Sequence, residues 1–403
     1  MEIKKRNKPT FELWEVIVIA LISALVMSLA TGYVIFRDKG ISDCKIALNN
    51  PHIGEFINSY TTIINNFHNE VDENTLIEAA IKGMLSYLGD PYSNFLNEES
   101  SENLVNSLRG TFEGIGISLS NEVDEPIILH VFEDSPAEEA GILIGDIVRI
   151  INDTTTEGKT SEEVVALIRN SETNIINLTI EREETLLEFN LTKTLIQIPQ
   201  VHSKIFEENN QRVGYLRVDI FSEIIGTQFQ RRLNELEDEN IDSLIIDLRN
   251  NSGGYLKGAV DIASMFLEEG SIIYQLRSRG TNTTEKVITN ETRDYRVYIL
   301  INCASASASE VLAAALRESY HGEVLIIGEQ SYGKGFIQTT STLSTGAMFT
   351  YTSAEWLTPE GNVVEGEGIT PDYIIELNNE FSLNSEAEND NQLQAALNRI
   401  TQR

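Results

Sequence analysis

Apolar residues recur along this chain with two different periods. From residue 56 to 67, and again from 76 to 88, they return at the spacing of one helix face. Thr75 and Glu78 stand at capping-box spacing where the second stripe begins. We therefore expect residues 41–105 to form a small helical region. A helical pair this short buries little by itself, so it should pack on the later domains or on a second copy of the chain.

The pattern changes between residues 106 and 195. Short apolar runs separated by Gly, Asn and Asp are typical of β-strands, and one helical stretch, Ser161 to Arg169, interrupts them. Short strands with a single helix indicate a compact, partly open β-barrel. Within it, FEGIGISL resembles the carboxylate-binding loop of a PDZ domain, and DSPAEEAGILIGDIVRIND resembles the signature that follows this loop.

The glycines of the first motif give this resemblance a physical basis. Gly114 and Gly116 would let successive backbone N–H groups turn toward one point, which makes a nest for a terminal carboxylate. The strand that follows offers an edge to an extended peptide. The residues expected to bind a peptide are Gly114, Ile115, Gly116 and Ile117, with Val165 on the helix facing the last side chain of the peptide. The alternative is that the glycines only form a turn between two strands.

From residue 196 to 378, uninterrupted apolar strands alternate with glycine-containing turns and helices. Such strands, at 244–247, 297–302 and 324–327, are typical of a buried and largely parallel sheet. We expect an α/β core here. Residues 379–403 are polar and are interpreted as a C-terminal tail with a short helix near its end.

The chain begins with a cationic cluster, which an uncharged stretch from Val16 to Phe36 follows. That stretch is long enough to cross about 30 Å of hydrocarbon as a helix, and its cationic flank should remain in the cytoplasm. Residues 1–40 are thus predicted to be a basic cytoplasmic end and a single-pass transmembrane anchor, with the catalytic part outside the cytoplasmic membrane. A cleaved signal peptide is the alternative, because Ser28-Leu29-Ala30 resembles a cleavage site.

Charge and cysteine content narrow the function further. The 403 residues include 30 Lys and Arg against 62 Asp and Glu, a formal charge of −32. Such acidity argues against binding nucleic acid, which needs clustered cations. Cys44 and Cys303 are too few for a disulfide scaffold or a thiolate zinc site, and no H-E-x-x-H motif occurs. We therefore expect no metal, no organic cofactor and no nucleic-acid partner.

Two segments carry candidate chemistry. In SASASE, residues 305–310, Ser309 stands at the start of an expected helix, where free N–H groups favour a developing negative charge. The alternative role for Ser309 is an ordinary N-cap. In GEQSYGKGFIQ, Lys334 lies between two glycines, and burial would lower its pKa so that a neutral amine accepts a proton. Gln338 comes four residues later, which in a strand puts both side chains on one face.

These segments do not stand alone. SASASE, GEQSYGKGFIQ, RNNSGG, GDPYSNFL and WLTPEGNVVEGEGITPD, around a PDZ-like insert, resemble the carboxy-terminal processing peptidases, or tail-specific proteases. The resemblance spans roughly residues 50–378. It implies that Ser309 is the nucleophile, that Lys334 is the general base and that Gln338 orients the lysine.

The resemblance also implies an oxyanion hole made by Gly253, Gly254 and the N–H of Glu310. Where the family usually has proline before the glycine pair, this chain has Ser252, which fixes the turn less tightly. The implied fold is mixed α/β and β. It comprises an N-terminal transmembrane helix, the helical region 41–105, a PDZ-like domain over 106–195 and a protease core of the Clp/crotonase-like type over 196–378.

The predicted function is a serine endopeptidase that recognises the C-terminal tails of extracytoplasmic proteins through its PDZ-like domain and cleaves them. Its predicted partners are protein substrates and the membrane, and a homodimer through the helical region is a hypothesis. One alternative is a non-catalytic or gated PDZ peptide-binding membrane protein. A second is a nucleotide-binding loop at residues 328–335, although Gly335 stands where a magnesium-binding Ser or Thr belongs.

Overall fold

The computed structural model describes residues 50–120, 125–289, 292–378 and 389–402, and the chain divides into two units, residues 1–83 and 84–403. Within the described ranges, no helix combines the length and the apolar character that crossing a membrane requires. The predicted anchor, residues 16–36, lies outside these ranges. The predicted fold class is corrected accordingly: the described residues support a mixed α/β chain and give no support for the transmembrane helix.

The predicted helical region, residues 41–105, contains α2 (Pro51–Asn66) and α3 (Glu73–Tyr87), and it also includes a short strand and most of a third helix, both described below. Tyr60 Oη in α2 donates to Glu73 Oε2 in α3 at 3.0 Å. The side chain that caps α3 is Asp72, which accepts from the Thr75 N–H at 2.7 Å, so the helix begins slightly earlier than the capping box suggests. No side chain of α2 is buried, and α3 buries only Leu85, so both apolar stripes remain uncovered.

A compact β-rich domain follows α4 (Glu98–Arg109). Its strands are β2 (Thr111–Gly114), β3 (Ile117–Leu119), β4 (Ile128–Val131), β5 (Ile147–Ile151), β6 (Thr154–Thr155), β7 (Ile175–Arg182), β8 (Thr185–Thr192) and β9 (Thr194–Gln197), and its helices are α5 (Pro136–Glu139) and α6 (Ser161–Arg169). Alternate residues of β7 point inward with two residues of β5 and two of α6 and form one apolar core. The buried residues of β5 are Val148 and Ile151, which a register shift separates by three positions, and those of α6 are Val164 and Ile168. β2 pairs with β9, and the Ile198 N–H donates to the Gly110 carbonyl at 2.8 Å, so the chain enters and leaves this domain side by side.

The α/β core contains a six-stranded sheet. Its order is β10 (Val201–Glu208), β11 (Gln211–Val218), β12 (Ser243–Asp247), β15 (Arg296–Ile301), β16 (Val324–Gly328) and β19 (Tyr373–Ile374). The first pair is antiparallel and the other pairs are parallel. Every residue of β12 is buried, which is why this strand reads as a continuous apolar run.

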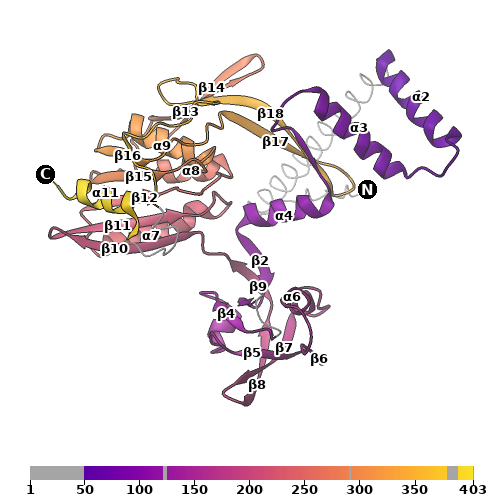
Figure 1. Cartoon of the computed structure of the whole chain (residues 1–403), viewed down its shortest axis with the longest axis horizontal. Helices are drawn as coiled ribbons and strands as arrows, with labels where there is room; N and C mark the ends of the chain where they lie inside the picture. Colours follow the sequence, from indigo (N-terminus) through magenta and orange to yellow (C-terminus); the bar gives the residue numbers. More distant parts are fainter. Residues whose placement is uncertain (1–49, 121–124, 290–291, 379–388, 403) are drawn as a thin grey trace, which may run out of the picture. The chain divides into compact units, whose positions relative to one another are not determined.

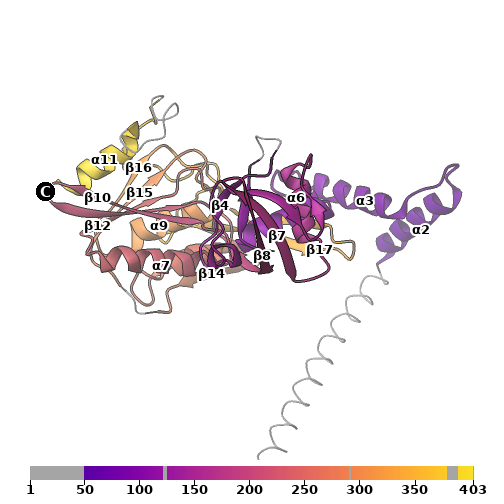
Figure 2. The same cartoon turned by 90° about the horizontal axis from the view of Figure 1, so that it is seen from below.

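Helices cover both faces of this sheet. Helices α7 (Ile225–Asp238), α8 (Leu256–Ala263) and α9 (Ala308–Ser319) pack on one face, and α8 and α9 lie side by side (Figure 1). The other face packs against α11 (Asn391–Ile400), on the opposite side of the strands from α7 (Figure 2). Leu393, Ala396, Leu397 and Ile400 are all buried there. Thus part of the segment interpreted as a polar tail is a layer of the core.

A second sheet, of five strands, adjoins α9. β18 (Met348–Leu357) pairs with β1 (Asn94–Leu96), β13 (Ile272–Ser278) and β17 (Phe336–Thr342), and β13 also pairs with β14 (Thr281–Lys286). The pairing of Phe95 with Phe349 shows that a segment preceding the β-rich domain contributes a strand to the core.

Candidate active site

Ser309 lies in the first turn of α9 and is fully buried. The helix is entered through Ser307, whose backbone has φ +54°, a conformation that costs a non-glycine residue on the order of 1–3 kcal/mol. Ser307 occupies the N-cap position, so Ser309 is not the cap of this helix. The Ser309 Oγ donates to the carbonyl of Asn251 at 2.9 Å.

The turn that follows β12 packs directly against the start of α9. Gly253 has φ +100° and Gly254 has φ +135°, and both values disfavour any residue with a side chain. A Cβ atom on Gly253 would lie 2.8 Å from the Ala306 carbonyl oxygen, and one on Gly254 would lie 2.3 Å from the Phe221 carbonyl oxygen. The close approach of the two turns thus requires Gly253, and the contact with Phe221 requires Gly254.

One of the three predicted oxyanion donors is unengaged. Among the described residues the Gly254 N–H has no hydrogen-bond partner, whereas the Glu310 N–H pairs with the Ser307 side chain in the capping box of α9. The Gly253 N–H donates to Asn251 Oδ1 at 2.9 Å. Asn251 is itself fully buried and donates through Nδ2 to the Val218 carbonyl at 2.8 Å, which ties the turn to β11.

A buried ion-pair network supports this turn from the other side of the sheet. Arg249 Nη2 contacts Asp247 Oδ2 at 2.5 Å and Asp390 Oδ2 at 2.7 Å, and all three side chains are less than a tenth exposed. Burial alone would lower the pKa of Arg249, but the attraction of Asp247 and Asp390 outweighs it and raises the pKa. Asp390 therefore joins the start of α11 to the turn that carries the glycine pair.

Lys334 lies in the connection between β16 and β17, with its side chain partly buried. Its N–H donates to Glu310 Oε2 at 3.0 Å, and its carbonyl accepts from Trp356 Nε1 at 2.8 Å. The amine lies 5.4 Å from the centre of the Tyr92 ring. Burial lowers the pKa of Lys334, while Glu365 and Glu310 oppose that shift.

Gln338 lies in β17 and donates through Nε2 to the Phe336 carbonyl at 3.2 Å. Lys334 precedes the strand, and the pairing with β18 shifts register between Ile337 and Gln338. The expectation that strand alternation puts Lys334 and Gln338 on one face is therefore wrong. No hydrogen bond joins the side chains of Ser309, Lys334 and Gln338, all of which the structure describes.

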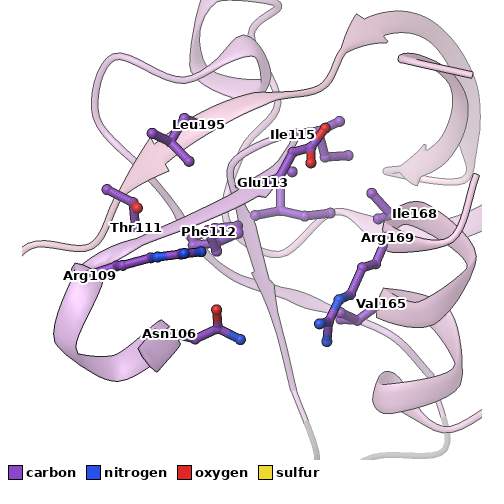
Figure 3. A pocket seen from close by; sticks show the side chains of 12 residues that line it. Asn106, Arg109, Thr111, Phe112, Glu113, Ile115, Val165, Ile168, Arg169 and Leu195 are labelled. Carbon is purple, nitrogen blue, oxygen red and sulfur yellow. The ribbon is translucent and has the colours of Figure 1, made fainter. Parts of the chain in front are cut away.

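The β-rich domain holds a cavity of about 520 Å³ beside α6 (Figure 3). Gly114, Ile115, Ile117 and Val165 line it, whereas Gly116 is absent from its lining. Gly116 has φ +90° and packs against Ser135, so its role is to form the turn. β3 pairs only with β4 among the described strands, which leaves its other edge open to an added strand.

Two arginines also line this cavity and were not predicted as binding residues. Arg109 reaches in from the end of α4, and Arg169 from α6 on the other wall (Figure 3). Arg169 could have been found from its place at the end of the expected helix. Tyr92 lies in GDPYSNFL, one of the motifs of the resemblance, but no role was assigned to it. Arg109 carries no signal in its local sequence that links it to the cavity.

Three family models match this chain. "Peptidase family S41" covers residues 212–375, "PDZ domain" covers 114–192, and "Activating protease CtpB N-terminal domain" covers 42–100. A "Probable CtpA-like serine protease" of Staphylococcus haemolyticus is 30% identical over 93% of this chain and 75% of its own length. The chain belongs to peptidase family S41. It is thus a serine-type carboxy-terminal processing peptidase with a PDZ domain, which confirms the family and the enzyme class predicted from the sequence.

Other relatives within the S41 family agree. The "Carboxy-terminal processing protease CtpB" of Bacillus subtilis is 34% identical over 80% of this chain and 68% of its own length. A solved structure titled as a putative S41 protease from Bacteroides fragilis has a TM-score of 0.50 and 19% identity, over 83% of this chain and 92% of that one. The second likeness shows a shared fold.

Proposed function

We propose that this S41 peptidase cleaves proteins near their C-termini with Ser309 as nucleophile, Lys334 as general base and Gln338 as the residue that orients the amine. The supporting observation is that the Ser309 turn touches the glycine turn, next to the Gly254 N–H, which has no partner among the described residues. The Ser309 oxygen attacks the peptide carbonyl carbon while its proton passes to the neutral Lys334 amine. The oxyanion is held by the N–H groups of Gly254 and Glu310.

The remaining steps return the enzyme to its starting state. Protonated Lys334 gives its proton to the leaving amine as the peptide C–N bond breaks, which leaves an acyl-Ser309 ester. Water then loses a proton to Lys334 and attacks the ester, and Ser309 regains its proton as the acid product departs. For this reaction the Ser309 hydroxyl must leave the Asn251 carbonyl, and the Lys334 amine must approach the hydroxyl. Peptide binding can supply this shortening of the distance between hydroxyl and amine.

We infer that the PDZ cavity captures the C-terminal tail of the substrate. An extended tail would add to the open edge of β3, and its last side chain would lie against Val165. Arg109 and Arg169 add positive charge to a cavity in which a carboxylate would sit (Figure 3).

The proposed substrates are extracytoplasmic proteins. The support comes from the sequence alone, whose cationic start followed by an uncharged stretch is typical of exported chains. Cell fractionation tests this location. We expect the peptidase activity in the extracytoplasmic fraction, and activity confined to the cytoplasmic fraction would contradict the proposal.

We further propose that α2 and α3 dimerise. The uncovered apolar residues include Phe56 and Ile57 of α2, Phe67 directly after it and Met84 of α3, each 45% exposed or more. Sedimentation of the purified chain should show a dimer, and the double variant Phe56→Ser with Ile57→Ser should shift it toward monomer. A parent chain that sediments as a monomer would contradict this.

The central experiment is hydrolysis of an unfolded protein with an apolar C-terminus. Ser309→Ala and Lys334→Ala should each lower kcat by about 10⁴-fold or more, with and without a chelator, while Lys286→Ala, which alters an exposed lysine, should behave as the parent. Cleavage by Ser309→Ala at the parent rate would refute the proposal. Peptide binding without cleavage by any form would favour a PDZ module that only binds.

A further inference from the structure

The carboxylate of Glu310 lies directly after Ser309 in the chain and is almost fully buried. Its exposed fraction is 1%. A buried carboxylate is stable only when its oxygens find hydrogen-bond donors or a cation. The donors around Glu310 therefore show what this charge holds in place.

Each oxygen of the Glu310 carboxylate accepts two hydrogen bonds. Oε1 accepts from Ser331 Oγ at 2.5 Å and from the Gly333 N–H at 2.7 Å. Oε2 accepts from the Lys334 N–H at 3.0 Å and from the Ser307 N–H at 2.8 Å. Because a carboxylate has about four acceptor positions, this one is saturated. Three of its four donors belong to the segment that carries Lys334.

That segment depends on such contacts. Residues 330–335 lie in neither a helix nor a strand, so no regular hydrogen-bond ladder fixes them. The Ser331 hydroxyl accepts from the Ile369 N–H at 2.6 Å while it donates to Glu310. A Cβ atom on Gly333 would lie 3.0 Å from the Gly368 nitrogen. The segment is thus held between α9 and the turn at residues 366–369.

We propose that Glu310 is a positioning residue, which holds the main chain of Lys334 at a fixed place relative to Ser309. This inference rests on the proposed function, in which Lys334 is the general base. Glu310 belongs to the same helical turn as Ser309. The hydrogen bonds of its carboxylate therefore fix the lysine segment relative to the nucleophile through one side chain. The substrate itself does not touch this carboxylate, which the four donors already occupy.

An acceptor-only group suits this place better than an amide. In Glu310→Gln, one oxygen becomes an NH₂ group that faces two donors and can accept from neither. The lysine segment would then lose part of its attachment to α9 without any change in side-chain size. A displacement of about 1 Å in a catalytic group can cost about 100-fold in rate.

The charge of Glu310 also affects the pKa of Lys334, and this effect distinguishes a positioning role from a purely structural one. Glu310 and Glu365 both raise the pKa of Lys334 against the effect of burial. Removing either charge should therefore lower that pKa and move the rise of kcat with pH toward lower pH. Glu365 is the matched control, because its Oε2 accepts from the Gly335 N–H at 2.8 Å and it has no bond to α9.

The experiment measures kcat and KM against pH for the full chain with an unfolded protein substrate. Glu310→Gln should lower the plateau kcat about 100-fold, leave KM near that of the parent and shift the profile to lower pH. Glu365→Gln should shift the profile in the same direction with a much smaller fall in the plateau. Glu310→Asp, which keeps the charge on a shorter stem, should recover part of kcat and the parent profile.

Glu310→Gln that keeps the parent plateau, or that lowers it no more than Glu365→Gln does, would overturn the proposal. Should Glu310→Gln fail to fold, Ser331→Ala decides, because it removes one donor and leaves the charge: a lower kcat with an unshifted profile supports positioning, and an unchanged kcat refutes it. Lys334→Ala run beside them separates the two proposals, since activity in that variant would refute the proposed base itself.

Discussion

The two halves of the candidate active site are built differently. On the serine half, residues 251–254 and 305–310, Ser309, Asn251 and Glu310 are all less than 2% exposed, and two glycines allow backbone contacts that admit no side chain. On the lysine half, residues 331–338, the main chain is well bonded, but the Lys334 side chain is partly exposed and rests on an aromatic ring.

This difference separates two requirements of the proposed reaction. An oxyanion hole works because its donors are already in place before charge develops, so that half gains from rigidity. A lysine base has to take and release a proton and therefore benefits from a side chain that moves on a fixed main chain. The comparison predicts that changes in the serine half damage stability and rate together, whereas changes around the Lys334 side chain alter the rate and its pH dependence.

Among changes that keep both Ser309 and Lys334, the largest expected effect comes from Gly254→Ala. The added Cβ would meet the Phe221 carbonyl oxygen at 2.3 Å at a φ of +135°, so the turn must shift away from Phe221 and displace the proposed oxyanion donor. We expect kcat to fall at least about 100-fold and the free energy of unfolding to fall by about 3 kcal/mol, as measured by hydrolysis and thermal unfolding.

Gly280→Ala is the matched control. Gly280 also has positive φ, at +89°, but has open space where its Cβ would lie. It should show only the conformational cost, about 1 kcal/mol, with kcat unchanged. Equal losses of kcat and of unfolding free energy in the two variants would show that the serine half is packed no more closely than an ordinary turn.

The next largest effect is expected for Asp390→Asn, which weakens the ion-pair network that supports the serine half from the other side of the sheet. Asparagine can still cap α11 at Leu393, so the change isolates the charge facing Arg249. Because Asp247 remains, we expect unfolding to become easier by about 2 kcal/mol and kcat to fall several-fold.

A surface pair provides the reference for Asp390→Asn. Asp261→Asn removes a partner of Lys257, which is 78% exposed, and should cost less than about 1 kcal/mol. Chemical denaturation compares the two variants. A smaller loss for Asp390→Asn than for Asp261→Asn would show that the network does not support the turn.

The pH dependence examines the lysine half. Burial lowers the pKa of Lys334, so kcat/KM should rise with pH through a midpoint below the usual lysine value, as the amine loses its proton. In the window between the folded and unfolded pKa values the unfolded chain binds more protons, so the free energy of unfolding should also rise with pH there. Below the folded pKa the penalty for the buried ammonium is fully present.

Two variants test the predicted rise of kcat/KM and of the free energy of unfolding with pH. Lys334→Arg keeps a permanent charge and should be inactive at every pH, and Lys334→Met should abolish the added slope in stability. A parent profile that falls as pH rises through the same window would contradict a neutral-amine base.

The smallest expected effect belongs to Tyr92. Tyr92→Leu removes the ring beneath the Lys334 amine and should lower kcat about threefold. Tyr92→Phe keeps the ring and loses only the hydroxyl's bond to Glu365, 3.1 Å long, so it should stay closer to the parent. Steady-state kinetics compare the two variants, and equal kcat values for Tyr92→Leu and Tyr92→Phe would mean that the ring contributes nothing.

Local sequence patterns predicted the elements better than their contacts. The α6 stretch and the buried strands follow from periodicity, because burial on one or both faces leaves a regular trace. The relation of Lys334 to Gln338 was missed because β17 begins only at Phe336, so Lys334 lies outside the strand whose alternation the prediction assumed. Tyr92 and Asp390 reach the site through tertiary packing, which no local pattern encodes, and the polarity of the segment around α11 concealed its four buried apolar residues.

The paired strands β2 and β9 have a consequence for how such a peptidase changes over time. Because the chain leaves the core at Gly110 and returns at Ile198, two residues joined by a hydrogen bond, the whole PDZ segment is an insertion at a single point. An insertion of this kind can be lengthened, exchanged or excised by joining neighbouring ends, without rerouting any strand of the core. Under the proposed function, substrate binding and bond cleavage then lie in separable parts of the chain, and a hybrid enzyme needs a compatible two-strand stem.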